Sequence, residues 1–402
     1  MIRPGLTRRT ALGAAAATLA VPAIGRAQGA ALRIGAPLPL TGGLAPEGAK
    51  QQRGYELWAD AVKAAGGLRV GDGRVPVEIV YADYESNTPK AVQLAERLIT
   101  QDKCTLLFAP QGSGATKAAS SVSERYKIPM VAATASSKEV YDQHYKFLFG
   151  TFTPNDTLTE PLADIVKAQA PVVKTVAILA RNDLFPLAIA QEMDKSAKAR
   201  GLEVAAFERY AIGTMDHASA LTRIAGAQPQ WLFATGYLND LILIRRQMAD
   251  LGLQPPVVTM IAGPAYKEFV GALGPLAENL TSAAWWHPAV RYENGAGPFP
   301  STEAFNAAFR AKYNAEPDYG EASSALCGTV FQLAIEAVGS TDPLKVRDGL
   351  AALDVMTFFG PIKFGPTGQV DTYTPPVFQI QGGKPLVLYP ALIKQGDFKL
   401  IG

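Results

Sequence analysis

The sequence predicts an α/β protein of two Rossmann-like lobes, each with a mainly parallel β-sheet covered by helices. The chain has 402 residues, of which 48% are apolar and 18% charged, so it can bury more than one hydrophobic core. From Leu32 onward, short apolar or β-branched runs alternate with helical stretches. This alternation is typical of parallel sheets whose strands are connected by helices.

The first 27 residues differ from the rest and predict an export signal. Arg8 and Arg9 precede an apolar run over 11–24, and the small residues Gly25 and Ala27 occupy the two positions that a signal peptidase reads. We expect cleavage after Ala27. The arginine pair resembles the twin-arginine signal of folded exported proteins, while the ordinary secretion route leads to the same compartment.

The charge balance argues against a nucleic-acid-binding protein. Residues 1–27 hold four of the 38 Lys and Arg and no acid, which leaves 34 basic against 36 acidic side chains. A nucleic-acid surface needs a basic excess. No later segment approaches the roughly 20 consecutive apolar residues of a membrane helix. We therefore expect a soluble exported protein.

The two cysteines and three histidines give weak signals. Cys104 and Cys327 fall in segments interpreted as a strand and a helix, where each can be a buried apolar residue or the two can pair in an oxidising compartment. His144, His217 and His287 show no metal-ligand spacing to one another or to the cysteines. We expect neither a metal nor another cofactor.

Strands are predicted wherever β-branched or apolar runs stand between turn residues. They are Leu32–Ala36, Val75–Tyr81, Thr105–Phe108, Met130–Ala133, Thr175–Leu179, Val204–Tyr210, Trp231–Ala234 and Val257–Met260. Helices are expected between most of them. One of these helices is predicted over Thr88–Ile99, with Thr88 as its cap, Pro89 in its first turn, and an apolar face of Ala91, Leu94, Ala95 and Leu98.

The last third of the chain changes character. Two helices are predicted over Ser301–Tyr313 and Glu321–Val338, followed by short strands near Pro361–Phe364, Pro376–Ile380 and Pro385–Leu388. This order suggests a chain that returns to a lobe it left earlier.

A loop that suits an anion follows the strand at 105–108. Residues 109–116 read APQGSGAT and begin a helix predicted to reach Tyr126. Glycines allow a tight turn, and a helix start offers unpaired N–H groups and a positive dipole end, with the Ser113 and Thr116 hydroxyls nearby. The plainer alternative is a capped turn without a ligand.

A second such loop follows the strand at 130–133, where Thr134, Ala135, Ser136 and Ser137 lead into another helical segment. Consecutive parallel strands end at one edge of a sheet, and open α/β sheets bind ligands at that edge. Neither loop contains Lys or Arg, so the pair fits a carboxylate better than a phosphate.

Catalytic motifs are missing from the sequence. Gly112-Ser113-Gly114 lacks the later glycine of a dinucleotide fingerprint, and neither a phosphate-loop motif nor a Gly-x-Ser-x-Gly elbow occurs. We therefore expect a protein that is not an enzyme. An exported hydrolase is the competing hypothesis, and it predicts turnover of the bound molecule.

Several aromatic residues follow predicted strands or precede a helix, namely Phe185, Tyr237, Trp285, Trp286 and Tyr319. Packing is the ordinary role of any one aromatic. Their repeated position at strand ends favours Phe185 and Tyr237 as residues that close over the apolar body of a ligand.

Six segments carry a resemblance to a known family. They are 35–42 (GAPLPLTG), 54–57 (GYEL) with 65–67 (AGG), the loop of Ser113, 128–130 (IPM), 135–137 (ASS) and 360–364 (GPIKF). In these segments, and over nearly all of the exported part, the chain resembles the type I periplasmic solute-binding proteins of the branched-chain amino acid (Leu/Ile/Val-binding) transport family.

The resemblance implies the type I periplasmic binding protein fold, in which two lobes joined by a three-segment hinge close around a solute. The crossings are expected near 150–153, 286–288 and 355–359, which gives a first lobe of 28–150 plus 287–357 and a second of 151–286 plus 358–402. The implied role is a periplasmic, monomeric receptor that hands its solute to an inner-membrane ABC permease and its ATPase. A ligand-sensing module is the alternative for this fold.

The resemblance also implies site residues. In the family a loop serine and a second loop hold the ligand's carboxylate, and aromatic residues close on it. The corresponding positions here are Ser113, Thr134, Ala135 and Ser136 for the carboxylate and Phe185, Tyr237 and Tyr319 for the closing wall.

Two departures from the family pattern concern the ligand. An early aromatic position falls at Glu47, and the acid that pairs with a ligand ammonium falls in 261–265 (IAGPA), which contains none. A buried ammonium without a counter-charge is costly. Either Glu47 or another acid such as Asp183 takes that role for an amino acid, with the branched-chain ones expected first, or the ligand is an aromatic or aliphatic carboxylate or a small amide.

Overall fold

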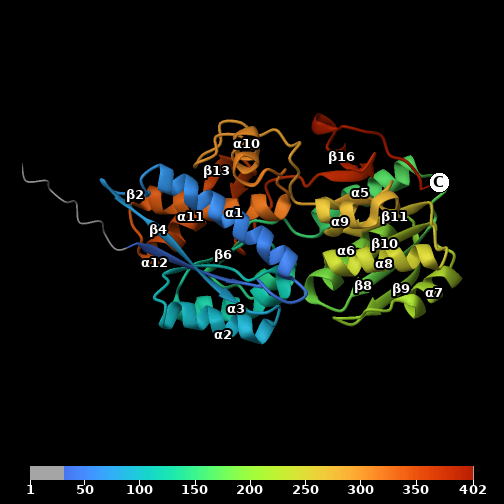
Figure 1. Ribbon diagram of the computed structural model, residues 1–402, viewed down its shortest axis with the longest axis horizontal. Coiled ribbons are helices and arrows are strands. Elements are labelled where there is room, and N and C mark those ends of the chain that lie inside the picture. Colours follow the sequence, from blue (N-terminus) through green and yellow to red (C-terminus); the bar gives the residue numbers. More distant parts are fainter. Residues whose placement is uncertain (1–30, 402) are drawn as a thin grey trace, which may run out of the picture.

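Two β-sheets organise the protein, and they lie at opposite ends of its long axis in the computed structural model, which describes residues 31–401 (Figure 1). The export signal predicted at residues 1–27 lies outside the described residues. The first sheet is fully parallel, with the order β4-β1-β5-β6-β7. Its strands are β1 (Leu32–Leu38), β4 (Val77–Asp83), β5 (Leu106–Phe108), β6 (Met130–Ala132) and β7 (Leu148–Gly150).

The second sheet has the order β16-β15-β12-β11-β10-β8-β9, in which β15 and β16 are antiparallel and the others parallel. Its strands are β8 (Thr175–Arg181), β9 (Glu203–Tyr210), β10 (Trp231–Thr235), β11 (Val257–Ile261), β12 (Thr281–Ala283), β15 (Val377–Gln381) and β16 (Lys384–Tyr389). Two small hairpins complete the described strands, β2 (Leu68–Val70) with β3 (Gly73–Val75) and β13 (Asp354–Thr357) with β14 (Gly360–Lys363). The predicted α/β class with parallel-rich sheets is confirmed.

Helices cover both sheets (Figure 1). They are α1 (Ala45–Ala64), α2 (Thr88–Thr100), α3 (Gly112–Tyr126), α4 (Lys138–Tyr141), α5 (Asp156–Gln169), α6 (Leu184–Ala199), α7 (Ala218–Gly226), α8 (Leu238–Asp250), α9 (Lys267–Leu273), α10 (Thr302–Tyr313), α11 (Tyr319–Val338) and α12 (Pro343–Ala351). Short 3-10 turns occupy Gly263–Ala265, Gly274–Ala277 and Ala391–Ile393. Within residues 31–401, no single helix is both long and apolar enough to span a membrane; α11 and α12 meet those criteria only together, and they meet at an angle of 106°.

All eight strands predicted for the first two thirds of the chain are present, with ends within two residues of the prediction. The predicted cap of α2 was wrong. Asn87 caps this helix, because its side chain accepts a hydrogen bond from the Lys90 N–H at 3.0 Å, and Thr88 is the first helical residue. The helix predicted from Glu321 begins at Tyr319, because the Asp318 carboxylate accepts from the Gly320 and Glu321 N–H groups.

The long helices α1 and α11, distant in sequence, pack against each other at two glycines. A Cβ on Gly328 would lie 2.1 Å from Trp58 Cδ2, and one on Gly54 would lie 2.2 Å from the Glu321 carbonyl oxygen. Tyr55 of α1 in turn stacks on Phe108 of the first sheet, with ring centroids 3.9 Å apart. This packing attaches α11 to the first sheet. Cys327 in α11 and Cys104, just before β5, are both buried free thiols.

Gly328→Ala should therefore destabilise the protein. The added methyl overlaps a buried indole ring, and overpacking a core costs about 1 to 3 kcal/mol. Gly271→Ala is the matched control, because a Cβ on this exposed α9 glycine meets no atom within 4 Å. Urea unfolding should show a clear loss for Gly328→Ala, and no loss or a gain of up to about 1 kcal/mol for Gly271→Ala. Equal stability of the two variants would contradict the packing described.

Candidate ligand site

The two loops singled out in the sequence lie side by side, because β5 and β6 are neighbours in one parallel sheet. The Ser113 Oγ accepts hydrogen bonds from the N–H groups of Ser136 and Ser137, at 3.2 and 3.3 Å. All three residues are completely buried. The hydroxyls of Ser136 and Ser137 have no partner among the described residues. These loops therefore concentrate polar groups at the carboxyl edge of the first sheet.

Thr134 connects the same two loops at the surface that faces the second sheet. Its hydroxyl accepts from the Gly112 N–H at 3.0 Å and donates to the Gln111 side-chain oxygen at 2.8 Å. Gly112 has a φ of +81°, and a Cβ there would lie 2.8 Å from the Tyr237 hydroxyl. Glycine thus allows both the turn of the loop and the close approach of Tyr237, which comes from the second sheet.

A small cavity of ≈ 20 Å³ lies where the carboxyl ends of the two sheets face each other. Its lining is Gln111, Thr134, Phe152, Phe185, Tyr237, Ala262, Tyr266, Trp285 and Tyr319. This lining is mainly aromatic, with neutral polar groups at one end. A space of this size holds about one water molecule. A ligand of amino-acid size therefore requires the surrounding elements to separate or the rings to move.

The aromatic rings around the cavity pack on one another. Phe152 and Trp285 are stacked with centroids 4.2 Å apart and planes 5° from parallel. Trp285 also contacts Tyr319 and Phe185, each with centroids 5.9 Å away, and its indole N–H donates to the Thr153 carbonyl at 2.9 Å. The rings form a wall into which a flat apolar group can insert.

Backbone strain marks one edge of the cavity. Ala262 follows β11 and has a φ of +83°, which is unfavourable for a residue with a Cβ. It lies in the 261–265 stretch whose lack of an acid the sequence already indicated. Such strain tends to be retained where a backbone conformation serves a site.

The predicted site residues fall into two groups. Thr134, Phe185, Tyr237 and Tyr319 line the cavity, whereas Ser113, Ala135, Ser136 and Glu47 are buried outside its lining. The lining residues that sequence reasoning did not assign to the site are Gln111, Phe152, Ala262, Tyr266 and Trp285. Gln111 belongs to the anion-binding loop predicted at 109–116, and Trp285 is one of the aromatic residues noted after predicted strands, so there was a reason in the sequence to consider both. Phe152 and Tyr266 carried no such signal in the sequence.

Glu47 joins the two halves of the molecule instead of lining the cavity. Its Oε1 accepts from the Leu238 N–H at 3.1 Å, at the start of α8 beside the second sheet. Its Oε2 is buried and has no partner among the described residues. Burial raises the pKa of Glu47 from 4.5 to about 7, although the Leu238 N–H opposes this shift. The other candidate acid, Asp183, caps α6 by accepting from the Leu184 N–H at 2.7 Å.

Lys50, one turn further along α1, is a buried cation in the same interface, and nearby carboxylates balance its charge. Its Nζ lies 2.6 Å from Asp318 and 3.0 Å from Glu268, the latter on α9 beside the second sheet. It also sits 4.4 Å from the centre of the Tyr266 ring. Burial alone would lower the pKa of Lys50, but Asp318, Glu321 and Glu268 outweigh it and hold this pKa above its ordinary value.

Metal sites are not indicated by the side chains of residues 31–401, where no group of three or more His, Cys, Asp or Glu has suitable geometry.

Comparisons with known proteins agree over most of the chain. A family model described as a periplasmic binding protein matches residues 31–384. The Leu/Ile/Val-binding protein homolog 8 of Brucella abortus (strain 2308) is 27% identical over 383 residues, covering 92% of this chain and 93% of the relative. A leucine-, isoleucine-, valine-, threonine- and alanine-binding protein of Pseudomonas aeruginosa is 25% identical, covering 87% and 89%.

Solved structures of substrate-binding proteins also superimpose on most of this chain. The branched-chain amino acid transporter substrate-binding protein LivJ of Streptococcus pneumoniae, in complex with isoleucine, superimposes with a TM-score of 0.79 and 26% identity, covering 90% of this chain and all of that one. A solute-binding protein of an R. palustris ABC transporter, in complex with benzoate, gives a TM-score of 0.76 at 22% identity, covering 89% and 95%. The second likeness concerns the fold alone.

Glu47 makes folding stability depend on pH. The folded protein keeps a proton on Glu47 up to about pH 7, whereas the unfolded chain releases it near pH 4.5, so the free energy of unfolding falls as pH rises through this window. The loss attributable to Glu47 is up to roughly 3 kcal/mol. Glu47→Gln keeps the neutral form, so urea unfolding at pH 8 should show it to be more stable than the unmodified protein.

The control for this series is Glu203→Gln, which removes an exposed carboxylate on β9. Burial also raises the pKa of Glu321, but this residue is common to all three proteins and cancels in the comparison. A Glu47→Gln protein with the same pH dependence of unfolding as the unmodified one would show that Glu47 is already charged at neutral pH.

Proposed function

The chain belongs to the periplasmic binding protein family, and from this premise we propose that it captures a small organic acid or amide for an ABC importer. The observation that carries the proposal is the cavity between the carboxyl ends of the two sheets, with hydrogen-bonding loops on one side and aromatic rings on the other. Ligands of open α/β sheets bind at this edge. We propose export by residues 1–27 with cleavage after Ala27, and action as a monomer with an inner-membrane permease and its ATPase.

The proposed lobes follow from where the chain crosses between the sheets. Tyr373 Oη donates to the Thr151 carbonyl at 2.8 Å, and Trp285 Nε1 donates to that of Thr153. Ala284 N–H donates to the Pro376 carbonyl at 3.2 Å. Three segments thus run together, near 151–153, 284–288 and 371–376. We propose these three segments as the crossings.

We place the third crossing later than the expected 355–359, because the chain stays beside the first sheet beyond that point. Phe358 stacks on Phe305 of α10 with centroids 4.3 Å apart, and the Val370 N–H donates to the Gly150 carbonyl at the end of β7. The proposed lobes are therefore 31–150 with 289–370, and 154–283 with 377–401. Closure of these lobes about the crossings is the proposed capture step.

The proposed carboxylate or amide position is at the two loops of the first lobe. Thr134 and Gln111 present neutral polar groups to the cavity, and the Ser113 hydroxyl holds the second loop through the N–H groups of Ser136 and Ser137. When the loops rearrange around a ligand, these N–H groups are available to an anionic oxygen. Phe185, Tyr237 and Tyr319 are proposed to close on the ligand's apolar body.

The lining favours a ligand without an ammonium group. It contains no acid, and a buried ammonium with no counter-charge is costly. An aromatic or aliphatic carboxylate, or a small amide, meets no such penalty, and six rings offer stacking partners. A protein that only binds and releases such a molecule performs no chemistry on it, so we propose no catalytic residue.

An amino acid is the second candidate. It is favoured by the Glu47 Oε2, which has no partner within residues 31–401, and by the names of the relatives. For this ligand the Glu47 carboxylate must leave its place behind the lining and reach the ammonium.

A thermal-shift screen distinguishes the candidates. Benzoate, short aliphatic carboxylates and benzamide should be compared with leucine, isoleucine and valine, and a ligand at a hundred times its Kd should add about 2.7 kcal/mol of stability. We expect stabilisation by members of the first group. Stabilisation by the branched-chain amino acids alone would select the second candidate, and no response to any small acid or amide would contradict the proposed function.

Variants then localise the binding. Ser113→Ala should weaken the identified ligand by roughly 1 to 3 kcal/mol, because it removes the acceptor that positions two loop N–H groups. Ser121→Ala, on the exposed face of the same helix, removes a hydroxyl whose one hydrogen bond in the described part of the chain goes to the Ala118 carbonyl. Its affinity should be unchanged. Equal affinity of Ser113→Ala would remove this loop from the site.

A further inference from the structure

A larger hollow of ≈ 650 Å³ lies next to the small cavity. Tyr266 and Tyr319 line both spaces, so the two rings separate them. Their hydroxyls are hydrogen-bonded at 2.6 Å and their rings are stacked with centroids 5.2 Å apart. We call this larger space the hinge groove, because residues 286–289 near the second crossing form part of its wall.

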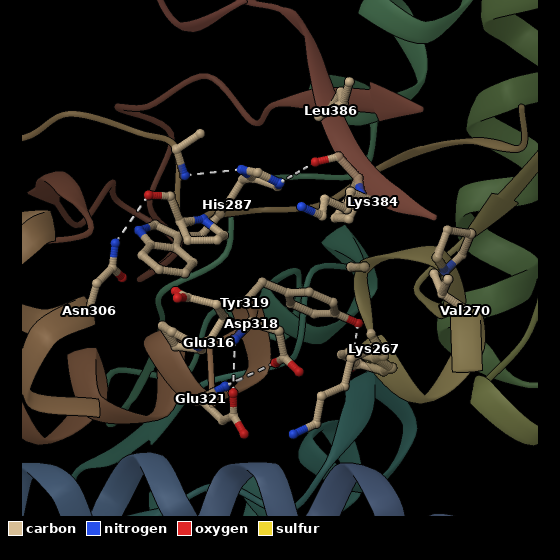
Figure 2. Close-up of a pocket in the computed structure, with 18 of the residues that line it drawn as sticks. Lys267, Val270, His287, Asn306, Glu316, Asp318, Tyr319, Glu321, Lys384 and Leu386 are labelled. Atoms are coloured by element: carbon tan, nitrogen blue, oxygen red, sulfur yellow. Dashed lines mark hydrogen bonds between the residues drawn. The ribbon is translucent and has the colours of Figure 1, made fainter. Parts of the chain in front are cut away.

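The walls of the hinge groove come from both halves of the molecule (Figure 2). Asn306 of α10 and Tyr319 of α11 lie on the side of the first sheet. Lys267 of α9 and Lys384 of β16 belong to the side of the second sheet, and His287 lies between. Volumes of 300 to 1,000 Å³ are typical of small-molecule sites. The groove is thus large enough for a ligand that the small cavity excludes.

The acids that line the groove have ion-pair partners, whereas some of its cations do not. Each acid of the lining has a cationic partner, although Glu303 and Glu316 share Arg310. Asp318 pairs with Lys50 and Glu321 with Arg53. Three cations of the lining form no ion pair within the described residues, namely Lys267, Arg291 and Lys384. All three are exposed and so accessible to a ligand. With five Lys and Arg against four acids, the lining carries a small net positive charge, and its exposed cations can bind an anion.

Two buried polar atoms of the lining residues are also unsatisfied. The Trp286 indole N–H and the Asn306 side-chain oxygen have no partner in residues 31–401. Buried polar groups are normally hydrogen-bonded, so these two atoms leave bonding capacity unused at the groove wall among the described residues.

His287 adds no charge to the groove. Its Nδ1 accepts from the Ala289 N–H at 3.0 Å, so its Nε2 carries the proton and donates to the Pro385 carbonyl at 3.2 Å (Figure 2). Burial lowers the pKa of His287 to about 4, which keeps the ring neutral at physiological pH.

We propose that the hinge groove is a second ligand site, which takes an organic anion with a flat apolar body. The anionic end lies at one of the exposed lysines of the lining, Lys267 or Lys384, and the apolar body lies against Tyr319 and the half-buried Val270 and Leu386. Because the groove has walls from both halves, its occupant contacts both. Through Tyr266 and Tyr319 it also adjoins the small cavity.

The test compares 2-naphthoate with its neutral isostere 2-naphthamide by titration calorimetry on the exported chain. We expect 2-naphthoate to bind more tightly than the amide. Lys267→Gln combined with Lys384→Gln should weaken 2-naphthoate about tenfold and leave the amide unchanged. The control, Lys345→Gln combined with Lys399→Gln, removes two exposed lysines outside the groove and should have no effect.

A third variant separates this site from the proposed function. Ser113→Ala should retain 2-naphthoate binding, because Ser113 lies outside the groove lining. Binding lost in Ser113→Ala but kept in the double lysine variant would place 2-naphthoate in the small cavity and overturn the second site, with the proposed function intact. Equal affinity for the acid and the amide, or no binding of 2-naphthoate, would also overturn it.

Discussion

The hydrogen bonds between Ser113 and the N–H groups of Ser136 and Ser137 are the constraint on which the site depends. They exist because β5 and β6 are adjacent parallel strands whose carboxyl ends meet at one edge. A single buried hydroxyl thereby satisfies two loop N–H groups that would otherwise be orphaned. The same bonds fix where Thr134 and Gln111 stand, and so fix the polar end of the cavity. Tyr237, at the start of α8, approaches this edge at Gly112.

The interface between the two halves contains two buried ionisable side chains, one held charged and the other held neutral. Lys50 is surrounded by carboxylates from both sides and stays charged. Glu47, one turn away, has only a backbone N–H of α8 as partner, so burial favours its neutral form. The ion pairs of Lys50 are thus insensitive to pH near neutrality, whereas the contact between Glu47 and Leu238 responds to pH there. Any movement that opens the interface hydrates Glu47 and removes the cause of its shift.

Much of this arrangement could be predicted from the sequence. Strands are specified by short apolar runs, so β1, β4 and β8 to β11 were predicted to within two residues. The two polar loops were predicted as neighbours because their position after consecutive strands follows from parallel topology. The family resemblance is likewise confirmed by the matches over residues 31–384.

Other features depend on contacts between distant segments, and the sequence does not encode them locally. The three-residue strands β7 and β12 were not predicted, although β5 and β6 of the same length were. Tyr266 lines the cavity because η1, the 3-10 turn at Gly263–Ala265, directs the chain there, and Glu47 meets α8 only after both sheets have assembled. The α2 cap was misassigned because Asn87 and Thr88 are both good capping residues, and the geometry alone selects Asn87.

The central claim is that the two halves close on a ligand at the edge set by Ser113. Small-angle X-ray scattering tests it most directly, by the radius of gyration of the exported chain with and without the saturating ligand that the screen identifies. The account predicts a smaller radius with ligand. The described cavity of ≈ 20 Å³ is too small to admit one, so the ligand-free chain must populate a more open state, and the bound ligand then holds the two halves together. An identical radius in both conditions would contradict the trap and require entry by side-chain movement alone.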